Sequence, residues 1–147
     1  MIEELTLRGF KSYSAARTET VTFTRGVNKI AGRNAAGKTT ILEAVLFGLY
    51  GDVPGVNKQD LVPLGGSGLE VIIKLRSPLT GQTAVIRREG NLAKDGGFRT
   101  SKSVMTVEGE GHAYSRERDI QSRLRELLGI GRNTFLNVVY AQQKEFI

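Results

Sequence analysis

Cysteine is absent from this sequence of 147 residues. Its absence excludes disulfide bonds, thiolate catalysis and metal sites built on thiolates. The single histidine, His112, therefore lacks cysteine partners for a metal site, and we interpret it as a loop residue. No segment approaches the roughly 18 consecutive apolar residues of a membrane span, and the first ten residues lack the layout of a signal peptide. These absences indicate a cytoplasmic protein without a membrane segment, stabilised by packing.

The length and composition are those of one soluble globular domain. A chain of 147 residues can bury one core and is too short for two ordinary domains. Hydrophobic residues make up 39% and charged residues 24%, and the 18 glycines imply many turns. The net charge of +6 favours a polyanionic partner, but the charges are scattered and fit a merely soluble basic surface equally well.

The first third of the chain has the periodicity of strands followed by a helix. Alternating apolar residues predict two antiparallel strands at residues 4–10 and 19–23. A short apolar run at residues 27–31 predicts a third strand. Helical spacing begins at Lys38 and predicts a helix that ends near Gly51. The third strand and the helix flank a glycine-rich loop.

The middle of the chain predicts antiparallel sheet, and a further helix follows it. Strands are expected at residues 69–75 and 83–88, joined by a turn at 78–81, and again at 103–107. Ser115 can cap the helix, and Gly129 and Gly131 can end it. The apolar stripe of this helix consists of Ile120, Leu124, Leu127 and Leu128.

The segment GRNAAGKTT, residues 32–40, satisfies the pattern G-x-x-x-x-G-K-[ST] in full. Its glycines let backbone N–H groups point at phosphates, Lys38 adds a charge for the β- and γ-phosphates, and the Thr39 hydroxyl can bind Mg²⁺. A chance match in a chain of this length is about a 1% event, so we favour binding of Mg-ATP over a glycine-rich turn with a surface lysine. The nucleotide-binding residues predicted here are Gly32, Asn34, Ala35, Ala36, Gly37, Lys38, Thr39 and Thr40.

Three sequence blocks resemble one family of ATPases. They are GFKSY at residues 9–13, GRNAAGKTTILEAVLFGLYG at 32–51 and NTFLNVVYAQQ at 133–143, in this order. Together they resemble the N-terminal head lobe of the Rad50-type DNA double-strand-break repair ATPase, which belongs with the SMC-like, ABC-type ATPases. Residues 53–132 match only in layout. The resemblance implies an α/β P-loop NTPase fold over residues 1–147, with a mixed sheet around the P-loop helix and an antiparallel β portion.

The resemblance also implies residues beyond the phosphate loop. Lys11 and Ser12 would meet the nucleotide, although by themselves they are typical of a solvated turn. Gln143 would bind Mg²⁺ and sense the γ-phosphate, so the implied catalytic residues are Lys38 and Gln143. A shift of one residue would give this role to Gln142. The residues implied to touch the base are Val62, Pro63 and Leu64.

The chain departs from the family pattern in two ways. It has Asn34-Ala35 where the family usually has Asn-Gly, which could change nucleotide affinity because alanine tolerates fewer backbone angles than glycine. It also has no LSGG-like signature and no apolar run that ends in Asp-Glu; both belong to the family's C-terminal lobe. We therefore expect the chain alone to bind ATP and barely to hydrolyse it.

The partners implied by the resemblance are a C-terminal ATPase lobe of the same protein, reached through a coiled coil, a second head that dimerises on ATP, an Mre11-type nuclease and double-stranded DNA. Arg99 and Lys102 could contact the DNA backbone, although a solvated surface is the more usual role of such residues. The compartment would be cytoplasmic and nucleoid-associated in a prokaryote, or nuclear in a eukaryote. Two alternatives stay open: the same lobe of an SMC chromosome-condensation ATPase, and a stand-alone P-loop nucleotide-binding module.

Overall fold

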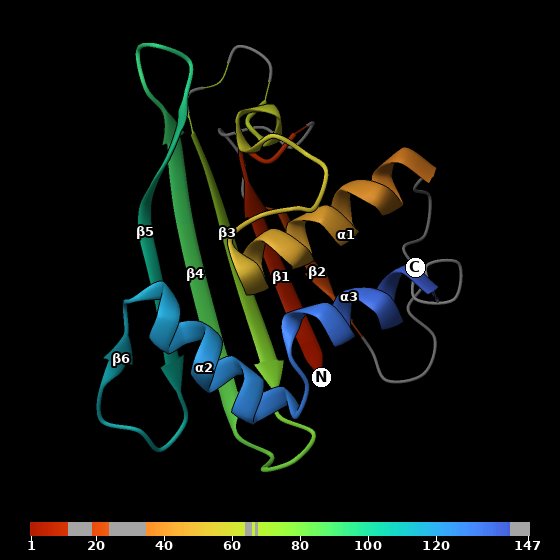
Figure 1. The fold of residues 1–147 in the computed structure, drawn as a ribbon, viewed down its shortest axis with the longest axis vertical. Helices are drawn as coiled ribbons and strands as arrows, with labels where there is room; N and C mark the ends of the chain where they lie inside the picture. Colours follow the sequence, from red (N-terminus) through yellow and green to blue (C-terminus); the bar gives the residue numbers. More distant parts are fainter. Residues whose placement is uncertain (12–18, 24–34, 64–65, 67, 142–147) are drawn as a thin grey trace.

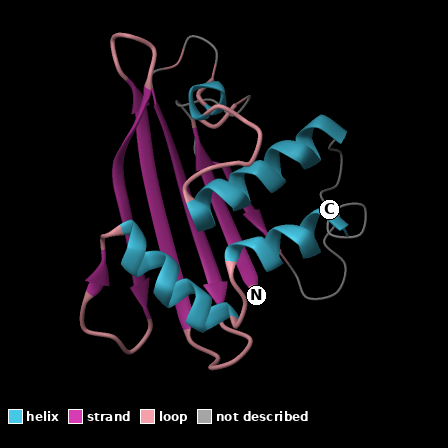
Figure 2. Ribbon diagram, in the orientation of Figure 1, coloured by secondary structure: helices cyan, strands magenta, loops and turns pink. Residues whose placement is uncertain are grey.

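The computed structural model of the chain describes residues 1–11, 19–23, 35–63, 66 and 68–141, with the backbone alone at 35–39 and 139–141. These residues form one six-stranded antiparallel sheet in the order β2-β1-β3-β4-β5-β6. The helices cover one face of this sheet (Figures 1 and 2). The elements are β1 Ile2–Arg8, β2 Glu19–Thr22, α1 Ala35–Tyr50, the 3-10 helix η1 Lys58–Leu61, β3 Gly68–Arg76, β4 Thr83–Leu92, β5 Phe98–Val107, β6 Ala113–Tyr114, α2 Glu117–Leu128 and α3 Arg132–Ala141.

Most of the strands match the sequence predictions. The two strands expected at residues 4–10 and 19–23 are the antiparallel pair β1 and β2, and the hairpin expected at 69–75 and 83–88 is β3 and β4. β5 begins at Phe98, five residues before the predicted start, because the Phe98 ring lies over Gly90 of β4 and extends the strand pair. The strand expected at 27–31 lies outside the described residues.

The helix α1 begins earlier than predicted. The apolar spacing starts at Lys38, but the backbone is helical from Ala35, since alanine is the strongest helix former. Ala35, Ala36 and Gly37 are therefore in the first turn of α1 rather than in the loop before it. The predicted end is confirmed: α1 stops at Tyr50, and Gly51 follows with φ +81°, a left-handed conformation that glycine adopts without strain.

The start of α2 was predicted one residue too early. The N-cap residue is Arg116, and no side chain caps the helix there, so Ser115 does not play the predicted part. Glu117 and Asp119 in the first turn place negative charge at the positive end of the helix instead. Gly129 ends α2 with φ +79°, as predicted. The predicted apolar stripe is buried: Ile120, Leu124, Leu127 and Leu128.

The core lies between the inner face of the sheet and α1. Alternate residues of β1, β3 and β4 point into it, as the two-residue period of a strand requires. The Phe47 ring of α1 lies at its centre, 6.1 Å from the Phe10 ring and 6.0 Å from the Phe98 ring. The fully buried apolar strand residues include Leu5, Leu7, Val71, Ile73, Leu75, Ala84 and Ile86.

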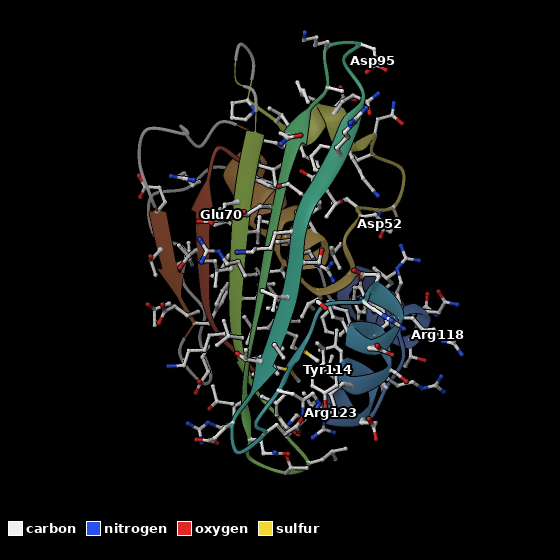
Figure 3. The ribbon with its side chains drawn as sticks, turned by 90° about the vertical axis from the view of Figure 1, so that its left-hand side faces the viewer. Asp52, Glu70, Asp95, Tyr114, Arg118 and Arg123 are labelled. Atoms are coloured by element: carbon white, nitrogen blue, oxygen red, sulfur yellow. The ribbon has the colours of Figure 1, made fainter. Side chains whose placement is uncertain are left out.

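The other face of the sheet is polar. Arg87 of β4 donates from Nε and Nη2 to Glu70 Oε2 of β3, at 3.0 Å and 2.6 Å. Figure 3 shows Glu70 on the sheet, away from Asp52 and from Arg118 of α2. Among the described residues, no helix is long and apolar enough to cross a membrane.

Gly48 lets α1 lie directly on β3. A Cβ added at this glycine would lie 2.3 Å from Ile73 Cδ1 and 2.7 Å from Ile73 Cγ1, closer than atoms can approach. We therefore expect Gly48→Ala to lower the free energy of unfolding by about 1–3 kcal/mol, through overpacking. Urea unfolding measures the loss.

The matched control for this substitution is Gly111→Ala. A Cβ at Gly111 meets nothing within 4 Å, so its substitution should change stability by less than about 0.5 kcal/mol. Helix propensity alone predicts the opposite sign for Gly48→Ala, a gain of about 1 kcal/mol. A Gly48→Ala chain that is as stable as the native one would contradict the close contact with Ile73.

Candidate nucleotide-binding site

The first turn of α1 carries the second half of the phosphate-loop motif. Ala35, Ala36, Gly37, Lys38 and Thr39 all have helical backbone. No acidic residue occurs in this turn, so no carboxylate of the turn itself offsets the positive end of the helix. A helix start of this kind favours an anion, because its first backbone N–H groups lack partners within the helix.

Glu43 of α1 holds the side chain of Lys11. The Lys11 ammonium donates to Glu43 Oε1 at 2.6 Å, and only 10% of the Glu43 side chain is exposed, against 31% for Lys11. A carboxylate in such a buried position needs a cation or several donors. The ion pair therefore fixes the turn after β1 beside α1.

The backbone of Lys11 joins a third segment to this place. Its N–H donates to the carbonyl of Leu61 at 2.6 Å, and Leu61 ends η1 immediately before Val62 and Pro63. Lys11 also has φ +51°, a left-handed conformation that costs a residue with a side chain about 1–3 kcal/mol. Such conformations persist only where the surrounding structure enforces them, and they cluster at binding sites.

The structure thus brings together several of the residues predicted for the site. Lys11, the segment that contains Val62 and Pro63, and α1 are joined by the contacts described above. Thr40 is buried on α1, with 7% of its surface exposed. The remaining predicted positions lie outside the described residues: Ser12, Gly32, Asn34, Leu64, Gln142 and Gln143.

Glu43 was missed by the sequence predictions. The available signal was an acidic residue inside the otherwise apolar run ILEAVLF, where a buried carboxylate implies a cation from elsewhere in the chain. Arg88, a buried arginine of β4, was also missed. The sequence does not show which residue pairs with either of them, so only the fold reveals the partner.

A cavity of about 440 Å³ opens at the opposite end of α1, beside Tyr50 and Gly51. Within the part of the chain that the structure describes, the buried Tyr50 hydroxyl has no hydrogen-bond partner. Burial raises the pKa of Tyr50 to about 12, against a smaller lowering by Arg132. The polar residues lining the cavity include Lys58, Thr100, Ser101, Lys102, Ser115 and Glu117. This cavity lies at the end of α1 opposite the turn that contains Lys38 and Thr39.

The two residues predicted to meet DNA, Arg99 and Lys102, are both exposed on β5. Lys102 lies opposite Glu89 of β4 in the strand register. His112 lies in the bend before β6, a loop position as predicted, with its ring 4.8 Å from the Tyr114 ring. No group of three His, Cys, Asp or Glu residues suited to a metal ion occurs among the described residues.

Solved structures with the same arrangement include the recombination mediator protein RecF and an SMC head domain. The recombination mediator RecF superposes with a TM-score of 0.60 at 23% identity, over 82% of this chain and 29% of its own. The SMC head domain from Thermotoga maritima gives 0.53 at 23% identity, over 83% of this chain and 41% of its own. The fold is therefore that of a P-loop, ABC-type ATPase head.

The family follows from sequence. A family model described as an AAA domain matches residues 4–147. The DNA double-strand break repair Rad50 ATPase of Methanocaldococcus jannaschii is 30% identical over 147 residues, 99% of this chain and 13% of the relative. That of Archaeoglobus fulgidus is 40% identical over 92 residues, 62% of this chain and 10% of the relative. The chain belongs to the AAA-domain family, as an N-terminal ATPase head of the Rad50 type. It spans between 10% and 13% of the length of these two relatives.

Proposed function

We propose that the chain is the ATP-binding half of a DNA double-strand-break repair ATPase. The observation that carries the proposal is the convergence of Lys11, the segment after η1 and α1, whose first turn completes the phosphate-loop motif. The described residues fit a nucleotide there. The first turn of α1 has no acidic residue, the Lys11 ammonium lies beside the helix, and Val62 is a buried apolar residue in the neighbouring segment.

Each residue would have a separate part in binding. Backbone N–H groups from Gly32 to Lys38 would cradle the phosphates, and the Lys38 ammonium would neutralise the β- and γ-phosphates. The hydroxyl of Thr39 and the amide of Gln143, or of Gln142, would hold Mg²⁺, which supplies charge neutralisation to the phosphates when it is bound. Lys11 and Ser12 would contact the nucleotide, and residues 62–64 would touch the base.

Hydrolysis requires groups beyond these. A water-orienting carboxylate and a second clamp on the γ-phosphate are needed, and the sequence has no candidate for either among its motifs. We infer that a C-terminal lobe supplies them, with residues 1–147 acting as the N-terminal half, and that two completed heads dimerise on ATP. The names of the curated relatives support double-strand-break repair. Control of an Mre11-type nuclease at DNA ends is the finer part of the proposal.

DNA would contact the first half of β5. Arg99 and Lys102 are exposed there, and Lys94 is exposed in the hairpin between β4 and β5. Exposed cations can neutralise backbone phosphates, with an affinity that falls as salt rises. The overall charge of +6 supports a polyanionic partner.

Two alternatives predict different behaviour. An SMC ATPase head shares the fold, but the two curated relatives described above are Rad50 ATPases. A stand-alone nucleotide-binding module would need no second lobe. Among the described residues, the large apolar side chains with high exposure are Met1, Leu79 and Val138.

The solution mass of this chain, co-expressed with its C-terminal counterpart and measured with and without Mg-ATP, tests the proposal. We expect ATP to double the mass of the native complex and to leave a Lys38→Ala complex unchanged. A stand-alone module would bind ATP without forming the complex. If the chain neither pairs with that lobe nor changes mass with ATP, the proposal fails.

A further inference from the structure

Arg88 is a charged side chain that lies almost entirely inside the protein. Only 1% of it is exposed, on the inner face of β4. All five of its N–H groups have acceptors. Nε donates to the carbonyl of Gly48 at 2.9 Å, and Nη2 to that of Leu49 at 3.0 Å. Nη1 donates to Ser103 Oγ at 3.0 Å.

The carboxylate of Glu117, the first residue of α2, takes the two remaining N–H groups of Arg88. Nη1 donates to Oε2 at 2.6 Å and Nη2 to Oε1 at 2.9 Å. About half of the Glu117 side chain, 48%, is exposed. The pair is a bidentate arginine–carboxylate contact, the most directional form of ion pair. We call Arg88 with its acceptors, Glu117 included, the Arg88 clamp.

The carbonyls held by Arg88 are those that a helix leaves without partners. The last four carbonyls of an α-helix have no N–H within it. At the end of α1, Gly51 N–H satisfies the carbonyl of Phe47 at 2.8 Å, and Arg88 satisfies those of Gly48 and Leu49. Gln121 of α2 adds a second donor to Leu49 at 3.0 Å. A guanidinium at this end also complements the negative end of the helix dipole.

We propose that Arg88 is a positioning residue for the phosphate loop, because the Arg88 clamp fixes one end of the helix whose other end carries that loop. The inference rests on the proposed function for its binding readout. The 16 residues of α1 make a rod about 24 Å long. A tilt of about 5° at its fixed end moves its first turn by about 2 Å. Binding sites require placement to within about 0.5 Å.

The clamp joins four elements at one point, which is why it can hold α1 in a single orientation. Arg88 comes from β4, and its acceptors come from the end of α1, from Glu117 at the start of α2 and from Ser103 of β5. Gly51 keeps the contact close, since a Cβ there would lie 3.3 Å from Arg88 Nη1. Without the guanidinium, the carbonyls of Gly48 and Leu49 would lose their donor from β4. The end of α1 would then be free to shift toward other hydrogen-bond donors.

Four variants in the full chain separate positioning from stability. Arg88→Met removes the donors to α1, and Arg88→Lys keeps the charge with fewer donors. Glu117→Gln leaves the donors to α1 in place but removes the negative charge that balances the buried Arg88 guanidinium. The matched control, Ser77→Ala, removes a buried polar contact at the far end of α2, where Ser77 Oγ donates to the carbonyl of Leu127 at 2.6 Å.

We expect Mg-ATP affinity to fall about tenfold in Arg88→Met, as when the competent population of α1 drops to about a tenth. Arg88→Lys should recover part of this loss. Glu117→Gln and Ser77→Ala should unfold at lower denaturant concentration while their affinities stay within about twofold of the native value. Affinity that falls in step with stability across all four variants, or that is unchanged in Arg88→Met, would overturn the proposal.

Hydrogen exchange of α1 provides a readout that does not depend on nucleotide. Arg88→Met should accelerate exchange in the hydrogen-bonded turns of α1 by about tenfold, and Ser77→Ala should not. If the native chain binds no Mg-ATP, the proposed function fails and exchange alone decides the role of the clamp. Equal exchange in the two variants would overturn the positioning role. If Arg88→Met does not fold, Arg88→Lys against Ser77→Ala makes the same comparison.

Discussion

Replacing Lys38 with alanine is expected to weaken Mg-ATP binding by at least about a hundredfold, or about 2.7 kcal/mol. The ammonium would make charge-assisted hydrogen bonds to two phosphates at once, each contributing about 1.5–3 kcal/mol. Lys38 is in the first turn of α1, where no acidic residue occurs. Titration calorimetry on the native and variant chains measures the difference.

Lys11→Ala is a second test of the same site, and Lys74→Ala is the control for both substitutions. Lys11 lies beside α1 on Glu43, so its loss should weaken binding by a smaller factor, about tenfold. Lys74 is exposed in β3, and its loss should leave binding unchanged. Unfolding of Lys11→Ala must be measured as well, because Glu43 then loses its cation. Native affinity in Lys38→Ala would show that the motif does not bind phosphate.

Local sequence signals predicted the framework of the fold and failed where distant residues decide the structure. The hairpin of β3 and β4 was predicted because apolar alternation on both sides of the turn at 78–81 is a local pattern. The start of β5 was not, because the packing of Phe98 over Gly90 depends on a neighbouring strand. α3 was not predicted, since asparagine, threonine and valine are weak helix formers and its burial comes from contact between Phe135 and Tyr50.

The same contrast holds for the candidate site. The phosphate-loop motif is visible in sequence because close spacing encodes it. Glu43 and Arg88 are not, because each finds its partner 32 and 29 positions away, in Lys11 and Glu117. Ser115 was wrongly predicted as the cap of α2. The N-cap residue is Arg116, and a serine near a helix start does not have to cap the helix.

The helix α1 is held by buried or half-buried charges from two directions. Lys11 pairs with its Glu43, and Arg88 caps its last carbonyls. Gly48, whose carbonyl accepts from Arg88, also lets the helix lie directly on Ile73. A buried charge is costly without its partner, so these contacts tolerate one arrangement and penalise others. The buried apolar residues of α1 also hold the helix, and among them Phe47 lies between two further rings.

Phe47→Ala is expected to lower the free energy of unfolding by about 3–5 kcal/mol. The ring is fully buried and bridges Phe10, which precedes Lys11, to Phe98 of β5. Its removal loses both ring contacts and leaves a cavity among rigid neighbours. Urea unfolding monitored by circular dichroism measures the loss, with Phe47→Leu as a partial replacement and a smaller effect. Leu79→Ala is the control, since that side chain is 65% exposed and its loss should change stability by less than about 0.5 kcal/mol. A Phe47→Ala chain within about 1 kcal/mol of the native one would mean that α1 does not depend on this aromatic cluster.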